Sequence, residues 1–161
     1  VVLSGVARFV HNVFRATLSM RKATLCGRRP LTRAQLLPLP IAELRRIQLK
    51  HHVALAALRD GQAGAAQLAT LLNAIYLAYF LDPANPASCR RAEAAIHHCA
   101  DRAERGEPLA LDDLERAAVA HVLARLDTQL AAVPMHYYVA AFERLQCVTT
   151  SDAIASPIPA G

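Results

Sequence analysis

A chain of 161 residues has the size of a single domain and is long enough to bury a core without disulfide staples. Hydrophobic residues make up 54% of it but aromatic residues only 5%, and Trp is absent, so Ala, Leu, Val and Ile must form the core, which suits closely packed helices. The formal net charge is +5, but the excess of Arg over Lys is typical of GC-rich coding DNA and says little about phosphate binding.

Charge is unevenly distributed along the chain. Residues 1–60 hold eleven Arg and Lys but only two acids, Glu43 and Asp60, whereas residues 61–161 hold seven Arg and eleven acids. A basic first third can bind an anionic partner, but the two parts can equally face each other in the fold. The four cysteines are scattered, without a CxxC motif or a secretory signal, so reduced thiols in a cytoplasm are expected.

Residues 1–19 predict an amphipathic helix, because the apolar side chains gather on one face at about 100° per residue. This face comprises Leu3, Val6, Phe9, Val10, Val13 and Phe14. We expect the helix to pack on the rest of the protein; a place on a membrane surface and an organellar presequence are the alternatives. Since the first Met is Met20, a further alternative is that translation starts there and that residues 1–19 lie upstream of the native protein.

Residues 20–40 predict a basic linker with one short helical turn after Thr32. Three prolines prevent a longer helix there: Pro30, Pro38 and Pro40. We assign residues 41–148 to the helical bundle domain and the small, polar and Pro-containing residues 149–161 to a flexible tail.

The first core helix is predicted from Ile41 to Asp60, and Gly61 ends it. Its main apolar stripe comprises Ile41, Leu44, Ile47, His51, Leu55 and Leu58. A second stripe on the far side comprises Leu49, Val53, Ala56 and Ala57. A helix that is apolar on two sides contacts neighbours on both or keeps one side for a partner. We therefore take the second stripe as a candidate surface for self-association or for a protein partner.

The second core helix is predicted from Ala63 to Leu81, and with the two preceding residues it gives 21 residues without a charge. This length could span a bilayer in principle. Four polar residues dilute the stretch, however: Gln62, Gln67, Thr70 and Asn73. We expect the central buried helix of a bundle rather than a transmembrane helix.

Three further helices are predicted at 87–105, 112–133 and 135–147. The inner face of the helix at 87–105 should comprise Cys89, Ala92, Ile96, Cys99 and Ala103. That of the helix at 112–133 should comprise Val119, Leu123, Leu126 and Leu130. That of the helix at 135–147 should comprise Met135, Tyr138, Val139, Phe142 and Leu145. Asp112 and Glu115 form a plausible capping box. Short turns between helices of similar length predict an all-α antiparallel bundle of about five core helices, with an extra amino-terminal amphipathic helix.

Metal binding is not predicted, although His97, His98 and Cys99 are contiguous. Neighbouring helical positions point about 100° apart, so His98 should face solvent while Cys99 faces the core. Cys89 is about 15 Å from Cys99 along the axis, too far to share an ion. The chain also has no glycine-rich phosphate loop, paired apolar carboxylates or nucleophile motif. We therefore expect no cofactor and lean towards a protein that is not an enzyme.

Three polar residues fall among apolar neighbours: Gln48, His51 and Asn73. Buried polar groups need partners, so a His51–Asn73 or Gln48–Gln67 contact across the first two core helices is conceivable. We favour a hydrogen-bonded core histidine that fixes helix register over a catalytic role, because candidate nucleophiles and carboxylates nearby are few.

A candidate nucleic-acid surface is basic: Arg28, Arg29, Arg33, Arg45, Arg46 and Lys50. Such a cluster is enough to attract phosphate, but reading bases would need a presented recognition helix, and no helix-turn-helix is evident.

A resemblance is carried by two runs within residues 30–147, LPIAELRRIQLKHHVALAAL and LLNAIYLAYFL. They look like short, uncharacterised helical proteins of GC-rich proteobacteria, some of which are classed as Fis-type transcriptional regulators. The likeness lies in the pattern of Leu, Ala and Arg, and no functional residue is carried over. We expect a non-enzymatic bacterial helical module that binds a protein partner or itself. A nucleic-acid-binding regulator is the first alternative and a membrane-associated protein the second.

Overall fold

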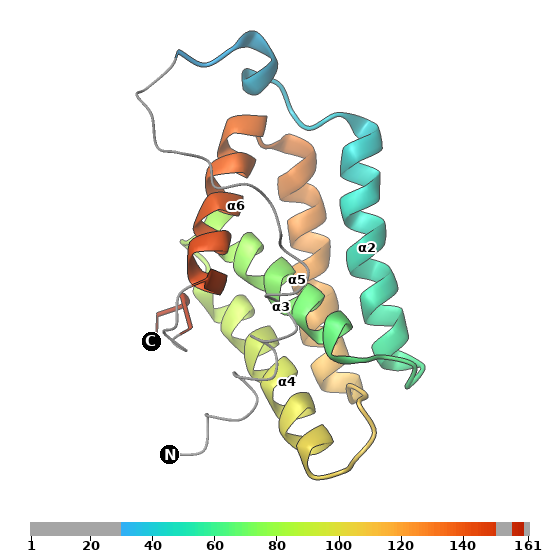
Figure 1. The fold of residues 1–161 in the computed structure, drawn as a ribbon. Helices are drawn as coiled ribbons and strands as arrows, with labels where there is room; N and C mark the ends of the chain where they lie inside the picture. The colour runs from blue at the N-terminus through green and yellow to red at the C-terminus, as the bar shows by residue number, and fades with distance from the viewer. Residues whose placement is uncertain (1–29, 151–155, 160–161) are drawn as a thin grey trace.

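The computed structural model describes residues 30–150 and 156–159, which form five α-helices and one short 3-10 turn (Figure 1). The turn is η1 (Arg33–Leu36), and the helices are α2 (Ile41–Arg59), α3 (Ala65–Leu81), α4 (Pro86–Glu104), α5 (Asp113–Ala132) and α6 (Met135–Thr150). Successive helices alternate in direction, so the predicted all-α antiparallel bundle is confirmed. The helix predicted over residues 1–19 lies outside the described residues.

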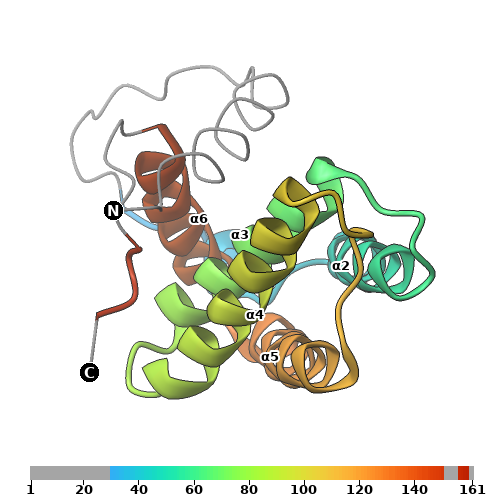
Figure 2. The same ribbon diagram turned by 90° about the horizontal axis from the view of Figure 1, so that it is seen from below.

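Helix α3 occupies the centre and contacts α2, α4, α5 and α6. Helices α2 and α5 lie side by side, and α3 and α4 cross them obliquely (Figure 2). Helix α6 packs against α3 and η1. The backbone N–H of Met135 donates to the carbonyl of Leu37 at 2.8 Å, so the linker before α2 is held at the start of α6.

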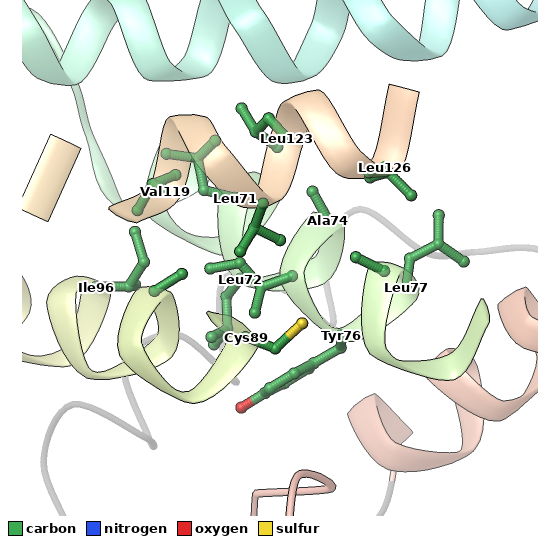
Figure 3. Close-up of a cluster of buried hydrophobic side chains, with 14 of the residues drawn as sticks. Leu71, Leu72, Ala74, Tyr76, Leu77, Cys89, Ile96, Val119, Leu123 and Leu126 are labelled. Atoms are coloured by element: carbon green, nitrogen blue, oxygen red, sulfur yellow. The ribbon is translucent and has the colours of Figure 1, made fainter. Parts of the chain in front are cut away.

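The composition of α3 explains its central place. It contains no charged residue, and nine of its 17 residues are buried: Leu68, Ala69, Leu71, Leu72, Ala74, Ile75, Tyr76, Leu77 and Ala78. These residues lie on every side of the helix. Exposing any side of α3 to water would therefore lose the free energy gained by burying apolar side chains. Figure 3 shows several of them packed between α4 and α5. Among the described helices, none combines the length and apolar character needed to cross a lipid bilayer.

The helix ends follow local sequence signals. Helix α2 stops where Gly61 adopts a φ of 65°, which side chains other than that of Gly rarely allow, and α4 begins with Pro86 at its first turn. The predicted capping box of α5 is confirmed, since Asp112 Oδ1 accepts the backbone N–H of Glu115 at 2.8 Å and Glu115 Oε2 accepts that of Asp112 at 3.0 Å.

The predicted inner faces of α4 and α5 are buried as expected, except that Ala103 is only half-buried. Two other residues were placed wrongly. Ile41 is exposed because it is the first residue of α2, and the packed face of that helix starts one turn later at Leu44. Val139 is exposed because, within the described part of the chain, the buried residues of α6 are Ala141 and Leu145, on another side of the helix.

The carboxy-terminal region differs from the predicted flexible tail at 149–161. Helix α6 continues to Thr150, and Ile158 is a member of the hydrophobic core. Arg90 Nη1 on α4 donates to the carbonyl of Pro159 at 3.1 Å. An isolated apolar side chain flanked by prolines has no periodicity, so sequence patterning did not single it out.

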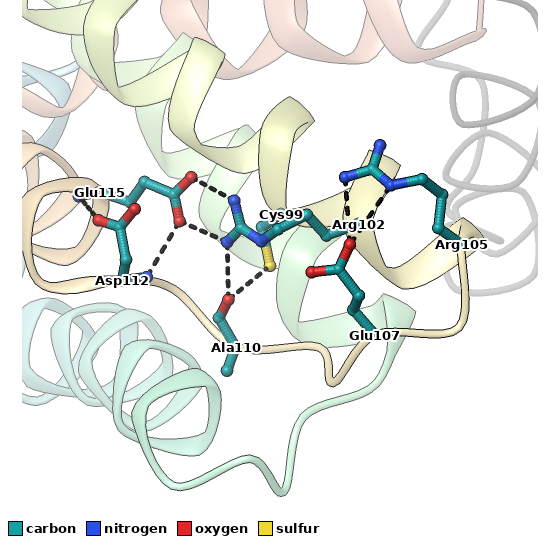
Figure 4. Close-up of polar contacts among 7 residues, drawn as sticks. All are labelled: Cys99, Arg102, Arg105, Glu107, Ala110, Asp112 and Glu115. Carbon is teal, nitrogen blue, oxygen red and sulfur yellow. Dashed lines mark hydrogen bonds and ion pairs between the residues drawn. The ribbon is translucent and has the colours of Figure 1, made fainter.

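A clamp of polar contacts closes the turn between α4 and α5 (Figure 4). The guanidinium of Arg102 donates to both carboxylate oxygens of Glu115, at 2.7 and 2.6 Å, and to the carbonyl of Ala110 at 3.0 Å. The Glu115 side chain is 10% exposed, and the bidentate bond from Arg102 holds the pKa of its carboxyl below the ordinary value. The neighbouring pair Arg105–Glu107 joins at 3.3 Å, with the Glu107 side chain 48% exposed.

These two pairs provide a matched test of stability. Replacing Glu115→Gln removes a shielded, bidentate charge, so we expect the free energy of unfolding to fall by about 2 kcal/mol in urea denaturation at neutral pH. Replacing Glu107→Gln removes an exposed charge, and the expected change is below about 1 kcal/mol. Equal effects of the two substitutions would contradict a structural role for the clamp.

Candidate macromolecular interface

The outward side of α2 combines exposed apolar and basic side chains. Leu49 is 64% exposed and Val53 is 57% exposed, and Ala56 continues the same stripe. At about 100° per residue these three positions lie opposite His51 and Leu58, which are buried against the bundle. The second stripe predicted from the sequence is thus exposed, apart from Ala57, which is half-buried.

Basic residues share this side of the helix. Arg45, Arg46 and Lys50 are all exposed and lie within about one quarter turn of the line through Leu49 and Val53. The Nη2 atom of Arg46 is 2.7 Å from Glu43 Oε1, so one of the three cations is paired. We define the outer face of α2 by six residues: Arg45, Arg46, Leu49, Lys50, Val53 and Ala56.

The structure thereby brings together two surfaces that the sequence suggested separately. The candidate protein-binding stripe and the candidate nucleic-acid cluster meet on the outer face of α2. Arg33 is exposed on η1, which lies beyond the first turn of α2, while Arg28 and Arg29 lie outside the described residues.

The three polar residues that the sequence placed in the core differ in how deeply they are buried. His51 is buried, with 8% of its surface exposed, whereas Gln48 and Asn73 are half-buried. The Nδ1 atom of His51 has no hydrogen-bond partner, and neither conceivable cross-helix contact, His51–Asn73 or Gln48–Gln67, is formed among the described residues. Gln67 Oε1 instead accepts the N–H of Gly64 at 2.9 Å, because the start of α3 exposes unpaired backbone donors.

A salt bridge next to His51 joins α2 to α5. His52 Nε2 is 2.8 Å from Asp127 Oδ2. The pKa of His51 is lowered to about 4, mainly by burial and also by the positive charge of Lys50, although the Asp127 carboxylate acts in the opposite direction. His51 is therefore neutral at neutral pH.

The thiols of Cys89 and Cys99 are buried, whereas Cys147 is exposed. Burial raises the pKa of the Cys89 and Cys99 thiols, which keeps both protonated at neutral pH. Cys99 is buried while His98 is exposed, as predicted for adjacent helical positions. Within residues 30–150 and 156–159, no group of three or more His, Cys, Asp or Glu side chains is placed to hold a metal ion.

A buried polar pair between α3 and α4 was missed in the sequence. The Tyr76 hydroxyl donates to Glu93 Oε1 at 2.7 Å, and both side chains are buried. Burial, assisted by the Glu93 carboxylate, raises the pKa of Tyr76. The available signal was the position of Glu93, four residues after the buried Cys89, which puts it on the inner edge of α4.

A groove of about 340 Å³ lies where α3 and α5 end and α6 begins. Its lining is apolar apart from the Tyr137 hydroxyl and one guanidinium: Phe80, Leu81, Val133, Pro134, Tyr137, Ala140, Ala141 and Arg144. The groove offers apolar contact but no carboxylate, imidazole or thiol, so the outer face of α2 is the better candidate for function.

Comparison of the chain with protein-family models, with curated proteins and with solved structures gives no match. The resemblance to helical proteins of proteobacteria thus stays a prediction.

Burial of the His51 imidazole predicts that the stability of the protein depends on pH. Because the pKa of His51 is about 4 in the folded protein and about 6.5 when unfolded, the unfolded state takes up a proton first as the pH falls. The contribution of His51 to the free energy of unfolding is present above pH 6.5 and is lost as the pH falls towards 4. We expect the free energy of unfolding to drop by about 2 kcal/mol between pH 7 and pH 5, measured by urea denaturation.

Replacing His51→Leu should abolish most of this slope and raise stability at neutral pH, because the unpartnered Nδ1 is removed. The matched control His98→Leu changes an exposed histidine and should leave the slope unchanged. A slope that persists in His51→Leu would show that another group is responsible.

Proposed function

We propose that the protein is a non-enzymatic binding module whose outer face of α2 docks a helical segment of another protein. The partner segment would carry an apolar stripe flanked by acidic side chains. The observation that carries this proposal is that Leu49 and Val53, one turn apart, stay exposed in the middle of three cations. This spacing is the one that a docked helix recognises.

Apolar burial supplies the affinity in this arrangement. Covering a Leu or Val side chain contributes about 1.5–3 kcal/mol, and these two side chains lie at the centre of the face. Arg45 and Lys50, at the rim, would attract acidic side chains and set the orientation of the partner rather than add much affinity.

Charge favours a separate acidic partner over a second copy of the chain. Two copies joined through this face would bring Arg45, Arg46 and Lys50 of each near the same cations of the other, and like charges that are close together oppose association.

Nucleic acid is the alternative occupant of the same face. Phosphate would use the cations but gain nothing from Leu49 and Val53, which supports the protein partner instead. The membrane alternative is based on two segments. Residues 3–18 lie outside the described residues, and most of residues 61–81 form α3 at the centre of the bundle.

A synthetic amphipathic helix about three heptads long, with Leu in its stripe and Glu on both flanks, is the probe for a first test. Fluorescence anisotropy should detect binding to the wild-type protein. Val53→Asn should weaken it about tenfold, which corresponds to the loss of one apolar contact. The matched control is Leu114→Asn, since Leu114 is 84% exposed but lies on α5, and it should bind as the wild type does.

Equal binding by Val53→Asn and the wild type, or no binding of the Glu-flanked peptide, would overturn the proposal. Retention on duplex DNA that is lost in Arg45→Ala with Arg46→Ala but kept in Val53→Asn would assign the face to nucleic acid. A Lys-flanked peptide serves as the charge control and should not bind.

A further inference from the structure

The short segment Ser156–Pro159 is attached to the bundle like a bound peptide. Ile158 is 4% exposed, whereas Ser156 and Pro159 on either side of it are exposed. The segment bends at Pro157 and Ile158, and a single buried anchor in such a short non-helical segment is typical of a peptide held on a surface. It differs from the repeating burial along the five helices.

A polar contact to the bundle lies next to this anchor. Arg90 Nη1 donates to the carbonyl of Pro159 at 3.1 Å. Within the segment, the hydroxyl of Ser156 accepts the N–H of Ile158 at 3.1 Å, and this hydroxyl lies near that of Tyr76. The segment is thus held by one apolar side chain and one carbonyl, with the Ser156 hydroxyl fixing its own backbone.

The receiving surface is built by the bundle itself. Tyr76 belongs to the aliphatic cluster of Figure 3, and its hydroxyl points away from the cluster towards the edge of α4. Its bond to Glu93 at 2.7 Å joins α3 to α4 without any atom of the segment. We define the tail-docking surface by Tyr76, Arg90 and Glu93.

The segment itself is stiff. The rings of Pro157 and Pro159 restrict φ at two of its four residues, which lowers the conformational entropy lost on docking. A prepared surface and a restricted ligand together allow short proline-containing peptides to bind proteins.

We propose that the tail-docking surface is a peptide-binding site and that Ser156–Pro159 is its internal ligand. Its external ligand is a segment of another protein with the same bend, in which Ile stands between two prolines and a hydroxyl-bearing residue precedes the first proline. Such a segment reproduces each contact above, and it enters only when the internal segment leaves. No residue of this site belongs to the outer face of α2, so the two binding proposals are independent.

Covalent linkage makes the internal segment a strong competitor. A tethered ligand acts at an effective concentration of roughly millimolar, so a separate peptide of the same sequence gains access only when the internal anchor is weakened. The site is consequently closed in the intact chain and open when Ile158 is released.

Full-length protein carrying Ile158→Asp tests this arrangement, because a charged side chain cannot stay in the apolar anchor position. The probe is a fluorescein-labelled peptide of sequence ASPIPAG, which matches residues 155–161. We expect the peptide to bind the variant at least tenfold more tightly than the wild type in fluorescence anisotropy. Adding Arg90→Ala to the variant should weaken binding, and a peptide with Asp in place of Ile should not bind.

Leu114→Asp places the same charge at an exposed position and should behave as the wild type. Far-UV circular dichroism checks that each variant is folded, and Ile158→Ser gives the same comparison if the Asp variant does not fold. Equal peptide binding by the folded variant and the wild type, or no binding by either, would overturn the proposal.

Discussion

Helix α3 has no charged side chain, and its buried residues point in every direction around its axis. Such a helix is stable in water only when neighbouring elements cover all of its sides. Helices α2, α4, α5 and α6 provide this cover, and each contacts α3 directly. The arrangement of the other helices therefore follows from the need to bury one segment.

Each helix that covers α3 therefore has one side packed against it and other sides with different contacts. Helix α4 uses small residues, including Cys89 and Ala92, which let its backbone come close to α3 and α5. Two polar groups at the edges of this core have partners there, Tyr76 in Glu93 and Arg102 in Glu115, whereas His51 Nδ1 has none among the described residues. Helix α2 lies at the side of the bundle, and its outward side is exposed.

Burial shifts the pKa values of several core groups towards the neutral form, as in His51, Tyr76 and Cys89. The pair of Arg102 and Glu115 does the opposite, because each partner favours the charged form of the other. The exposed surface instead offers pairs of apolar and basic side chains on α2, and an internal peptide docked against α3 and α4. The two binding proposals rest on these features.

For residues 30–150, the amino-acid sequence by itself determined the number, the approximate extent and the direction of the five α-helices. Periodicity, glycines such as Gly61 and the cap at Asp112 act within one or two turns, so they can be recognised without knowing the fold. The charge-free stretch ending at Leu81 likewise had to be central. Tertiary structure alone decided that the side of α2 with Arg45 and Leu49 is exposed and that Ile158 enters the core. It also left His51 Nδ1 without a partner among the described residues. These features depend on which segments meet in space, and that is set by packing between residues far apart in the chain.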